Sequence, residues 1–148
     1  MPTSLAQLRV AASSGGQWYA GNTTIAFSTS ASSCSPLNPP CELVTNAANG
    51  WVNQPRPLPA NGAVFVSEGN ATVSGTVDGN ISLGASADVV VKSSVYCADN
   101  PETNSASNDF VGLLAERNVV VSQSAPYNLD VQASIMALGE SFTVQNYW

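Results

Sequence analysis

The chain has 148 residues, enough for one domain with a hydrophobic core, and only 9% of them are charged. Histidine is absent, which excludes His-based general base catalysis, Ser-His-Asp triads and imidazole-bound zinc. The net charge is −6, and the four basic residues are scattered singly along the sequence: Arg9, Arg56, Lys92 and Arg117. Phosphate neutralisation needs a basic stripe, so DNA is a poor partner for this chain.

The first 62 residues predict an irregular N-terminal region of strands and loops. Leu5 to Val10 show a weak helical pattern, too short to stand alone, which we interpret as the end of a longer helix. Residues 18–20 and 23–29 alternate as strands do. Prolines and glycines between Asn46 and Asn61 indicate irregular or edge structure.

The three cysteines predict one disulfide and one free thiol. Cys34 and Cys41 bracket a proline-rich turn, and a bridge closing this loop would stabilise the fold by roughly 2.5 kcal/mol in the chain-entropy model. A disulfide would also indicate an oxidising, extracytoplasmic setting. Two reduced loop thiols are the alternative. Cys97 alternates with apolar neighbours, which predicts a buried free thiol.

Residues 63–148 contain the regular part of the sequence. Segments 83–91, 113–121 and 135–144 repeat one pattern: an apolar residue, an alanine two positions later, a polar corner and a short β-branched or aromatic run. Such a repeat buries its apolar face only by stacking on its neighbours. The sequence therefore predicts an all-β fold, a right-handed parallel β-solenoid (β-helix), over 63–148. We expect Ala85, Ala115 and Ala137 in successive rungs. Alternation places one further set of apolar residues in the core: Val64, Val66, Val73, Val77, Ile81 and Leu83.

Several stretches of this region resemble a known type of domain. The most specific is Asp-Phe-Val-Gly-Leu-Leu-Ala-x-x-Asn-Val-Val-Val at 109–121, and 73–85, 95–104, 133–137 and 141–148 add to it. Together they resemble the DUF4900 type of domain, found in bacterial pilus-assembly and pilin-like surface proteins, notably of Thermus and Deinococcus relatives. The resemblance implies a β-solenoid behind an N-terminal pilin-like membrane helix, so we expect membrane contact only through a segment preceding Met1. The family pattern continues after Tyr147-Trp148 into further strand. No catalytic residues carry over.

The polar stretch 99–109 is the candidate metal site. Calcium takes six to eight oxygen ligands, but the spacing here is not that of an EF-hand, and a solvated loop held by Asx turns is the alternative. The candidate ligands are Asp99, Asn100, Glu102, Asn104, Asn108 and Asp109.

Carboxylates and aromatic residues provide two further sets of candidates. A β-helix can support polysaccharide-cleaving enzymes that use paired acids, here Asp78, Asp88, Asp130 and Glu140. The alternative is that Asp88, Asn118 and Glu140 occupy equivalent corners and bond turn backbone. Exposed aromatic rings could stack on a glycan, although core or capping roles are the simpler interpretation: Trp18, Tyr19, Trp51, Tyr127, Tyr147 and Trp148.

These patterns favour a non-enzymatic, extracellular structural or adhesive module of a pilin-like or other cell-surface protein. Its expected partners are other pilins or surface components, or a glycan, and no cofactor is expected beyond the calcium alternative. A second hypothesis is a DNA-contacting tip module of a competence type IV pilus, a role that the resemblance suggests and the charge opposes. A third is a carbohydrate-active β-helix enzyme.

Overall fold

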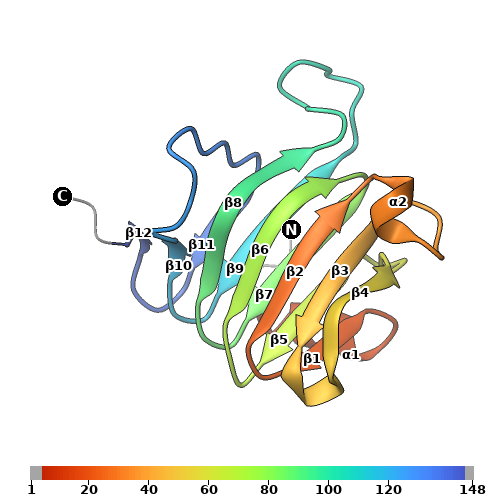
Figure 1. Cartoon of the computed structure of the whole chain (residues 1–148). Helices are drawn as coiled ribbons and strands as arrows, with labels where there is room; N and C mark the ends of the chain where they lie inside the picture. Colours follow the sequence, from red (N-terminus) through yellow and green to blue (C-terminus); the bar gives the residue numbers. More distant parts are fainter. Residues whose placement is uncertain (1–4, 146–148) are drawn as a thin grey trace.

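The computed structural model describes residues 5–145, which form two facing β-sheets with short helices at their margins (Figure 1). One sheet has five parallel strands in the order β1-β5-β7-β9-β11. These strands are β1 (Gln17–Ala20), β5 (Ala63–Ser67), β7 (Asn80–Ala85), β9 (Phe110–Ala115) and β11 (Ser134–Ala137).

The second sheet has seven strands in the order β12-β10-β8-β6-β2-β3-β4. From β5 onward, consecutive strands alternate between the two sheets. The strands of the second sheet are β2 (Thr23–Ser28), β3 (Cys41–Asn46), β4 (Trp51–Pro57), β6 (Ala71–Val77), β8 (Val89–Cys97), β10 (Val119–Val121) and β12 (Phe142–Val144). The helices are α1 (Leu5–Ser13), α2 (Ala31–Cys34) and the 3-10 helix η1 (Ala47–Asn49).

The prediction of an all-β, right-handed parallel β-solenoid is wrong. The fold is mixed α/β, with about 11% helix, one sheet of five parallel strands and one of seven strands in mixed directions. Antiparallel pairing enters through β3, which runs against both β2 and β4. The repeats begin only after residue 63, so they carry no information about the helix and the antiparallel strands that precede them. The division into 1–62 and 63–148 stays a prediction, and strands from both parts pair in each sheet.

The predicted register of the three repeats is confirmed. Ala85 lies opposite Ala115, and Ala115 lies opposite Ala137, in parallel pairs. The runs that follow are also paired in parallel, with Val119 between Val89 and Phe142. Ala85 and Ala115 are fully buried, and Ala137 is partly buried against the same core.

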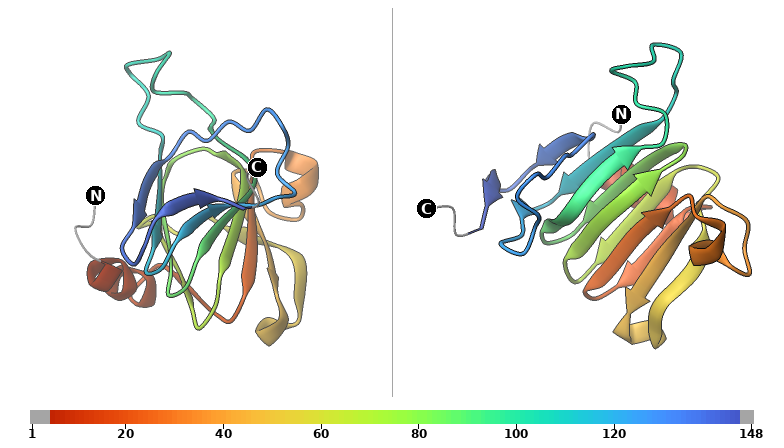
Figure 2. Two further views of the ribbon diagram at one scale, coloured as in Figure 1. Left: turned by 90° about the vertical axis from the view of Figure 1, so that its left-hand side faces the viewer. Right: turned by 45° about the horizontal axis from the view of Figure 1, so that its top comes forward.

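The core lies between the sheets, and a second apolar layer lies under α1. All six predicted core residues (Val64, Val66, Val73, Val77, Ile81 and Leu83) are buried in the central cluster. Helix α1 lies on the outer face of the five-stranded sheet (Figure 2). There Leu5 and Leu8 pack with Phe65 and Leu114. A Cβ at Gly84 would lie 2.5 Å from Leu8 Cδ2, so this glycine permits the close approach of the helix. The short helical pattern is thus a helix stabilised by packing.

A chain of side-chain hydrogen bonds connects the corners where the chain enters the seven-stranded sheet. Asn22 Oδ1 accepts from Asn70 N at 2.9 Å, and Asn70 Oδ1 accepts from Asp88 N at 3.0 Å. Asp88 Oδ1 accepts from Asn118 N at 3.0 Å, and Asn118 Oδ1 accepts from Ser141 N at 3.1 Å. We call Asn22, Asn70, Asp88, Asn118 and Ser141 the corner ladder. Each of the first four members accepts the backbone N–H of the next corner and so aligns it.

The corner ladder corrects one prediction about the third repeat. Asp88 and Asn118 bond turn backbone as expected, but Glu140 is not their equivalent. Phe142 lies opposite Val119, so Ser141 lies opposite Asn118. The additional corner residue of the third repeat displaces Glu140 by one position, where its side chain is exposed and its N–H donates to the Arg117 carbonyl.

The corner ladder predicts that removing the side chain of Asp88 destabilises the fold more than removing that of Glu140, although the sequence pattern places both acids at equivalent corners. Asp88→Ala should lower the free energy of unfolding by about 1–3 kcal/mol, because the Asn118 N–H loses its acceptor. Asp88→Asn keeps the acceptor oxygen and should retain most of the stability. Glu140→Ala is the matched control and should change stability by about 0.5 kcal/mol or less. Urea denaturation measures all three, and equal losses at Asp88 and Glu140 would contradict the ladder.

Candidate functional site

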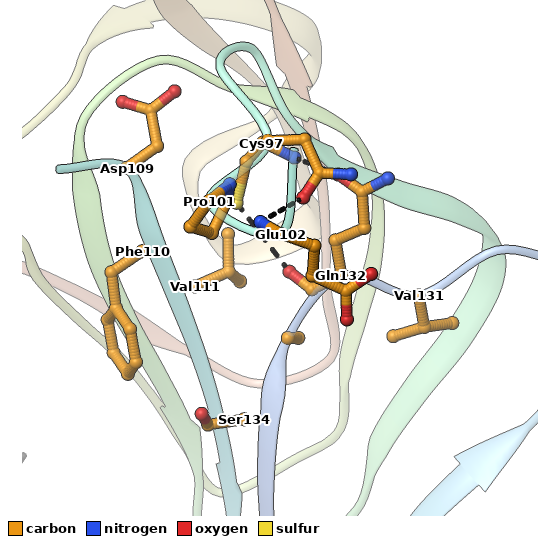
Figure 3. A pocket seen from close by; sticks show the side chains of 11 residues that line it. Cys97, Pro101, Glu102, Asp109, Phe110, Val111, Val131, Gln132 and Ser134 are labelled. Carbon is orange, nitrogen blue, oxygen red and sulfur yellow. Dashed lines mark hydrogen bonds between the residues drawn. The ribbon is translucent and has the colours of Figure 1, made fainter. Parts of the chain in front are cut away.

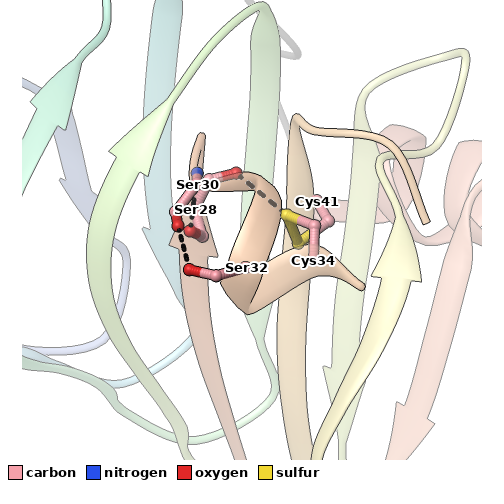
Figure 4. The surroundings of a disulfide bond; sticks show 5 residues. All are labelled: Ser28, Ser30, Ser32, Cys34 and Cys41. Atoms are coloured by element: carbon pink, nitrogen blue, oxygen red, sulfur yellow. Dashed lines mark hydrogen bonds between the residues drawn. A yellow bond between two sulfur atoms is a disulfide. The ribbon is translucent and has the colours of Figure 1, made fainter. Parts of the chain in front are cut away.

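The predicted disulfide is present between Cys34, at the end of α2, and Cys41, at the start of β3 (Figure 4). Both cysteines are fully buried. Cys97 is free and buried, also as predicted. In the described residues 5–145, no helix has the length and apolar character needed to cross a membrane.

The cysteine arrangement predicts the outcome of thiol labelling. Native protein treated with iodoacetamide without reductant should gain at most one carbamidomethyl group, because two sulfurs are bonded and Cys97 is only 7% exposed. Intact-protein mass spectrometry measures the number of groups, and unfolding without reductant should raise it to one. Two or three groups on native, unreduced protein would contradict the pairing.

The 99–109 loop is held by its own hydrogen bonds. The buried Asp109 accepts from Gly79 N through Oδ1 and from Asp99 N through Oδ2, both at 2.8 Å. The Asn104 side-chain amide donates to both carboxylate oxygens of Asp99. Asn100 Oδ1 accepts from the backbone N–H of Glu102.

Several predicted calcium ligands therefore meet in one loop, but their oxygens already accept N–H groups. Asn108 and the Glu102 side chain are exposed. Among the described residues, no three Asp, Glu, Cys or His side chains form a group that could hold a metal ion. The geometry is that of the Asx-turn alternative, and calcium binding stays a prediction.

A pocket of about 250 Å³ lies beneath this loop, lined in part by Cys97, Pro101, Phe110 and Gln132 (Figure 3). The Cys97 thiol donates to the Gln132 carbonyl at 3.7 Å, and the Gln132 side chain accepts from Cys97 N at 3.0 Å. Burial, with the nearby Asp109 carboxylate, raises the pKa of the Cys97 thiol. The thiol therefore stays protonated and is not an activated nucleophile.

The structure separates two of the acids proposed for carbohydrate chemistry, Asp78 and Asp88. Asp78 follows β6 and Asp88 precedes β8, and these parallel strands pair from Ala71–Val89 to Val77–Cys97. Asp88 is level with Asn70, eight residues before Asp78, so at about 3.3 Å per residue the two acids are roughly 25 Å apart along the strands, further than paired catalytic carboxylates are. Asp130 accepts from the Gln132 amide.

The four aromatic candidates within residues 5–145 do not form one surface. Tyr19 is buried and Trp51 is half-buried. Trp18 is 42% exposed, but its indole N–H donates to Ser67 and its ring centroid lies 4.9 Å from that of Phe65. Tyr127 is fully exposed. The other two, Tyr147 and Trp148, lie outside the described residues.

Three of the four basic residues contact acids or aromatic rings. Arg9 forms an ion pair with Glu116 and lies over the Phe65 ring. Arg117 is 4.0 Å from Asp88. Arg56 lies over the Trp51 ring, and Lys92 is exposed on β8. The contacts of the three arginines are with acids or rings, and the four basic side chains do not form a continuous basic stripe.

A buried polar cluster, which the sequence analysis did not predict, joins the two sheets at the β1–β4 end. Glu42 on β3 is fully buried, and Tyr19 on β1 is 2% exposed. The Tyr19 hydroxyl lies 2.6 Å from Glu42 Oε1 and 3.0 Å from Gln17 Oε1. The Gln17 side-chain amide donates to the Pro57 carbonyl on β4 at 2.6 Å. Tyr19 and Trp51 also meet edge to face.

One sequence signal could have indicated this cluster. In β3, Glu42, Val44 and Asn46 share one face by the two-residue period of a strand, and Val44 is a core residue. A carboxylate two positions from a core valine is therefore directed inward. Gln17 and Tyr19 have the same relation in β1. The sequence could not show that these two inward faces meet.

The β1–β4 end, which we call the closed end, has protected edges. Gln17 ties the edge strand β1 of one sheet to the edge strand β4 of the other. Pro55 and Pro57 on β4 have no N–H to donate to another strand. The unpaired edges of the sheets are therefore connected to each other at this end, and further strand addition is disfavoured.

The β11–β12 end, which we call the open end, is different. In the described part of the chain, β11 pairs only with β9 and β12 only with β10. Four apolar side chains are exposed there: Ile135 (36%), Leu138 (52%), Phe142 (52%) and Val144 (43%). An exposed apolar strand edge is a template for pairing with another chain.

No protein-family model, curated protein or solved structure matches the chain. The chain is a β-rich, disulfide-containing domain of two facing sheets, with one closed end and one open end.

Proposed function

We propose that the chain is a non-enzymatic structural module of an extracytoplasmic, pilin-like or other cell-surface protein. The resemblance of residues 63–148 to DUF4900-type domains suggests this class. The Cys34–Cys41 disulfide supports an oxidising location. The observation that carries the proposal is the contrast between the closed end and the open end, because a structural module needs a surface through which it joins its neighbours.

The open end is the proposed assembly surface, and its occupant is a second copy of the chain. Two open ends can pair through strand edges in a symmetric contact. That contact would cover Ile135, Leu138, Phe142 and Val144 in both copies. Head-to-tail stacking would instead place β12 against β4, where Pro55 and Pro57 withhold donors.

Charge favours the same contact. The molecule carries a net charge of −6, so two copies repel each other over most orientations. Strands β11 and β12, with the sequences SIMA and FTV, contain no charged residue, and the exposed Glu140 lies in the turn that joins them. Apposition of the open ends therefore buries apolar surface without placing carboxylates on these strands against each other.

Sedimentation velocity over a concentration series tests the proposal. The unmodified chain should show reversible dimer formation, and Phe142→Lys should weaken it by about tenfold or more, because a charge would be buried at the edge. The matched control is Val52→Lys, since Val52 is 78% exposed on β4 at the closed end. A chain that stays monomeric throughout, or equal weakening by both variants, would contradict the proposed contact.

A DNA titration separates this proposal from the competence-pilus alternative. Four basic residues can neutralise few phosphates, so we expect binding to duplex DNA no tighter than about 10⁻⁴ M near physiological salt. A mobility-shift titration measures this affinity. A micromolar complex that weakens steeply with added salt would favour the tip module instead.

A further inference from the structure

We propose that Glu42 is held as a neutral carboxylic acid whose proton completes a hydrogen-bonded relay across the closed end, so that ionisation of Glu42 loosens this end of the fold. The relay runs from Glu42 on β3 through Tyr19 and Gln17 on β1 to the Pro57 carbonyl on β4. This inference does not depend on the proposed function.

Counting protons in the cluster leads to the neutral acid. Gln17 must direct its NH₂ group to the Pro57 carbonyl, because the reverse orientation would oppose two acceptor oxygens. Gln17 Oε1 therefore faces Tyr19 as an acceptor, 3.0 Å from the hydroxyl. Glu42 Oε1 lies 2.6 Å from the same hydroxyl. A phenol has one proton and cannot donate to both oxygens.

A proton on Glu42 resolves this conflict. Glu42 Oε1–H then donates to the Tyr19 oxygen, the Tyr19 O–H donates to Gln17 Oε1, and the Gln17 amide donates to Pro57. Every contact then has one donor and one acceptor. If Glu42 ionises, the Tyr19 proton turns to the carboxylate, and Gln17 Oε1 faces an oxygen with no proton between them.

The surroundings of Glu42 favour the neutral form. The side chain is fully buried, and its Oε2 has no hydrogen-bond partner. A buried carboxylate with an unpartnered oxygen costs much more free energy than a buried neutral acid. Burial raises the pKa of Glu42 from 4.5 to about 7, although Tyr19 and Arg56 act to lower it. Burial is the main cause that raises the pKa of Tyr19, an ionised Glu42 would raise it further, and Arg56 acts to lower it, so the phenol keeps its proton.

The elements packed against Glu42 supply two titratable groups within the described chain. Tyr19 comes from β1, and Arg56, opposite Glu42 on β4, supplies the positive charge. Arg56 lies over the Trp51 ring, and its Nε is buried without a partner. Among the described ion pairs, none joins Arg56 to Glu42. On the other side, β2 places the uncharged Phe27 opposite Glu42.

The sign of the pH dependence follows from the raised pKa. Between about pH 4.5 and about pH 7, the folded chain holds a proton on Glu42 that the unfolded chain has lost. The contribution of Glu42 to stability therefore falls as the pH rises through this window, and it is constant above it. An amide at position 42 has no such dependence and can still donate to Tyr19.

The test compares Glu42→Gln with the wild-type chain by thermal unfolding from about pH 5 to about pH 8. We expect the Tm of Glu42→Gln to exceed that of the wild type increasingly as the pH rises, by roughly 5 °C at the upper limit. The matched control is Glu102→Gln, an exposed acid with the same change of charge, whose Tm should follow the wild-type profile.

Infrared difference spectroscopy of the folded wild type provides a second readout that survives a folding failure of the variant. At about pH 6 the wild type should show the C=O stretch of a protonated carboxylic acid, which is lost on titration through about pH 7. Glu102→Gln should keep this band and folded Glu42→Gln should lack it. A wild type without the band, or a Tm difference that is the same at every pH, would overturn the inference.

Discussion

The corner ladder is the interaction on which the arrangement of the parallel strands depends. Each corner residue from Asn22 to Asn118 accepts the backbone N–H of the next corner. A strand that slipped by one residue would turn its core side chains to solvent, and the ladder opposes such a slip at the point where each strand begins. The alignment of Ala85 with Ala115, the core between the sheets and the surface under α1 all follow from this register.

The two ends of the sheets meet different physical requirements. At the closed end, Gln17, Tyr19 and Glu42 are removed from water, so their hydrogen bonds must be satisfied internally. This requirement fixes how β1 faces β3 and β4, and it makes the protonation of one carboxyl group part of the fold. The open end has no such network in the described chain, and apolar side chains such as Phe142 stay exposed there. We thus propose that assembly and pH response involve opposite ends.

Much of the local chemistry was predictable, because it depends on short spacings. The Cys34–Cys41 bridge, the burial of Cys97 and the self-bonded 99–109 loop follow from turn formers and alternation. Glu42 was missed because a two-residue period shows which residues share a face but not what that face meets. The partner of Glu42 is Tyr19, 23 residues earlier and in the other sheet. The prediction that Glu140 is equivalent to Asp88 and Asn118 was wrong, because the third repeat has one additional corner residue and Ser141 occupies the equivalent position.

The sequence by itself determined the strand segments of the repeat region, their inward faces and the mutual register of the three repeats, since these depend on alternation within a few residues and on repetition. Tertiary structure decided the rest. It made the fold mixed α/β, because helix α1 and the antiparallel strands β3 and β4 come from residues without a repeat and are stable only where packing on the sheets buries them. It also decided the protonation state of Glu42. The pKa of a carboxyl group rises when neighbouring strands exclude water from it and falls when they bring a positive charge close to it, and these strands are distant in the sequence.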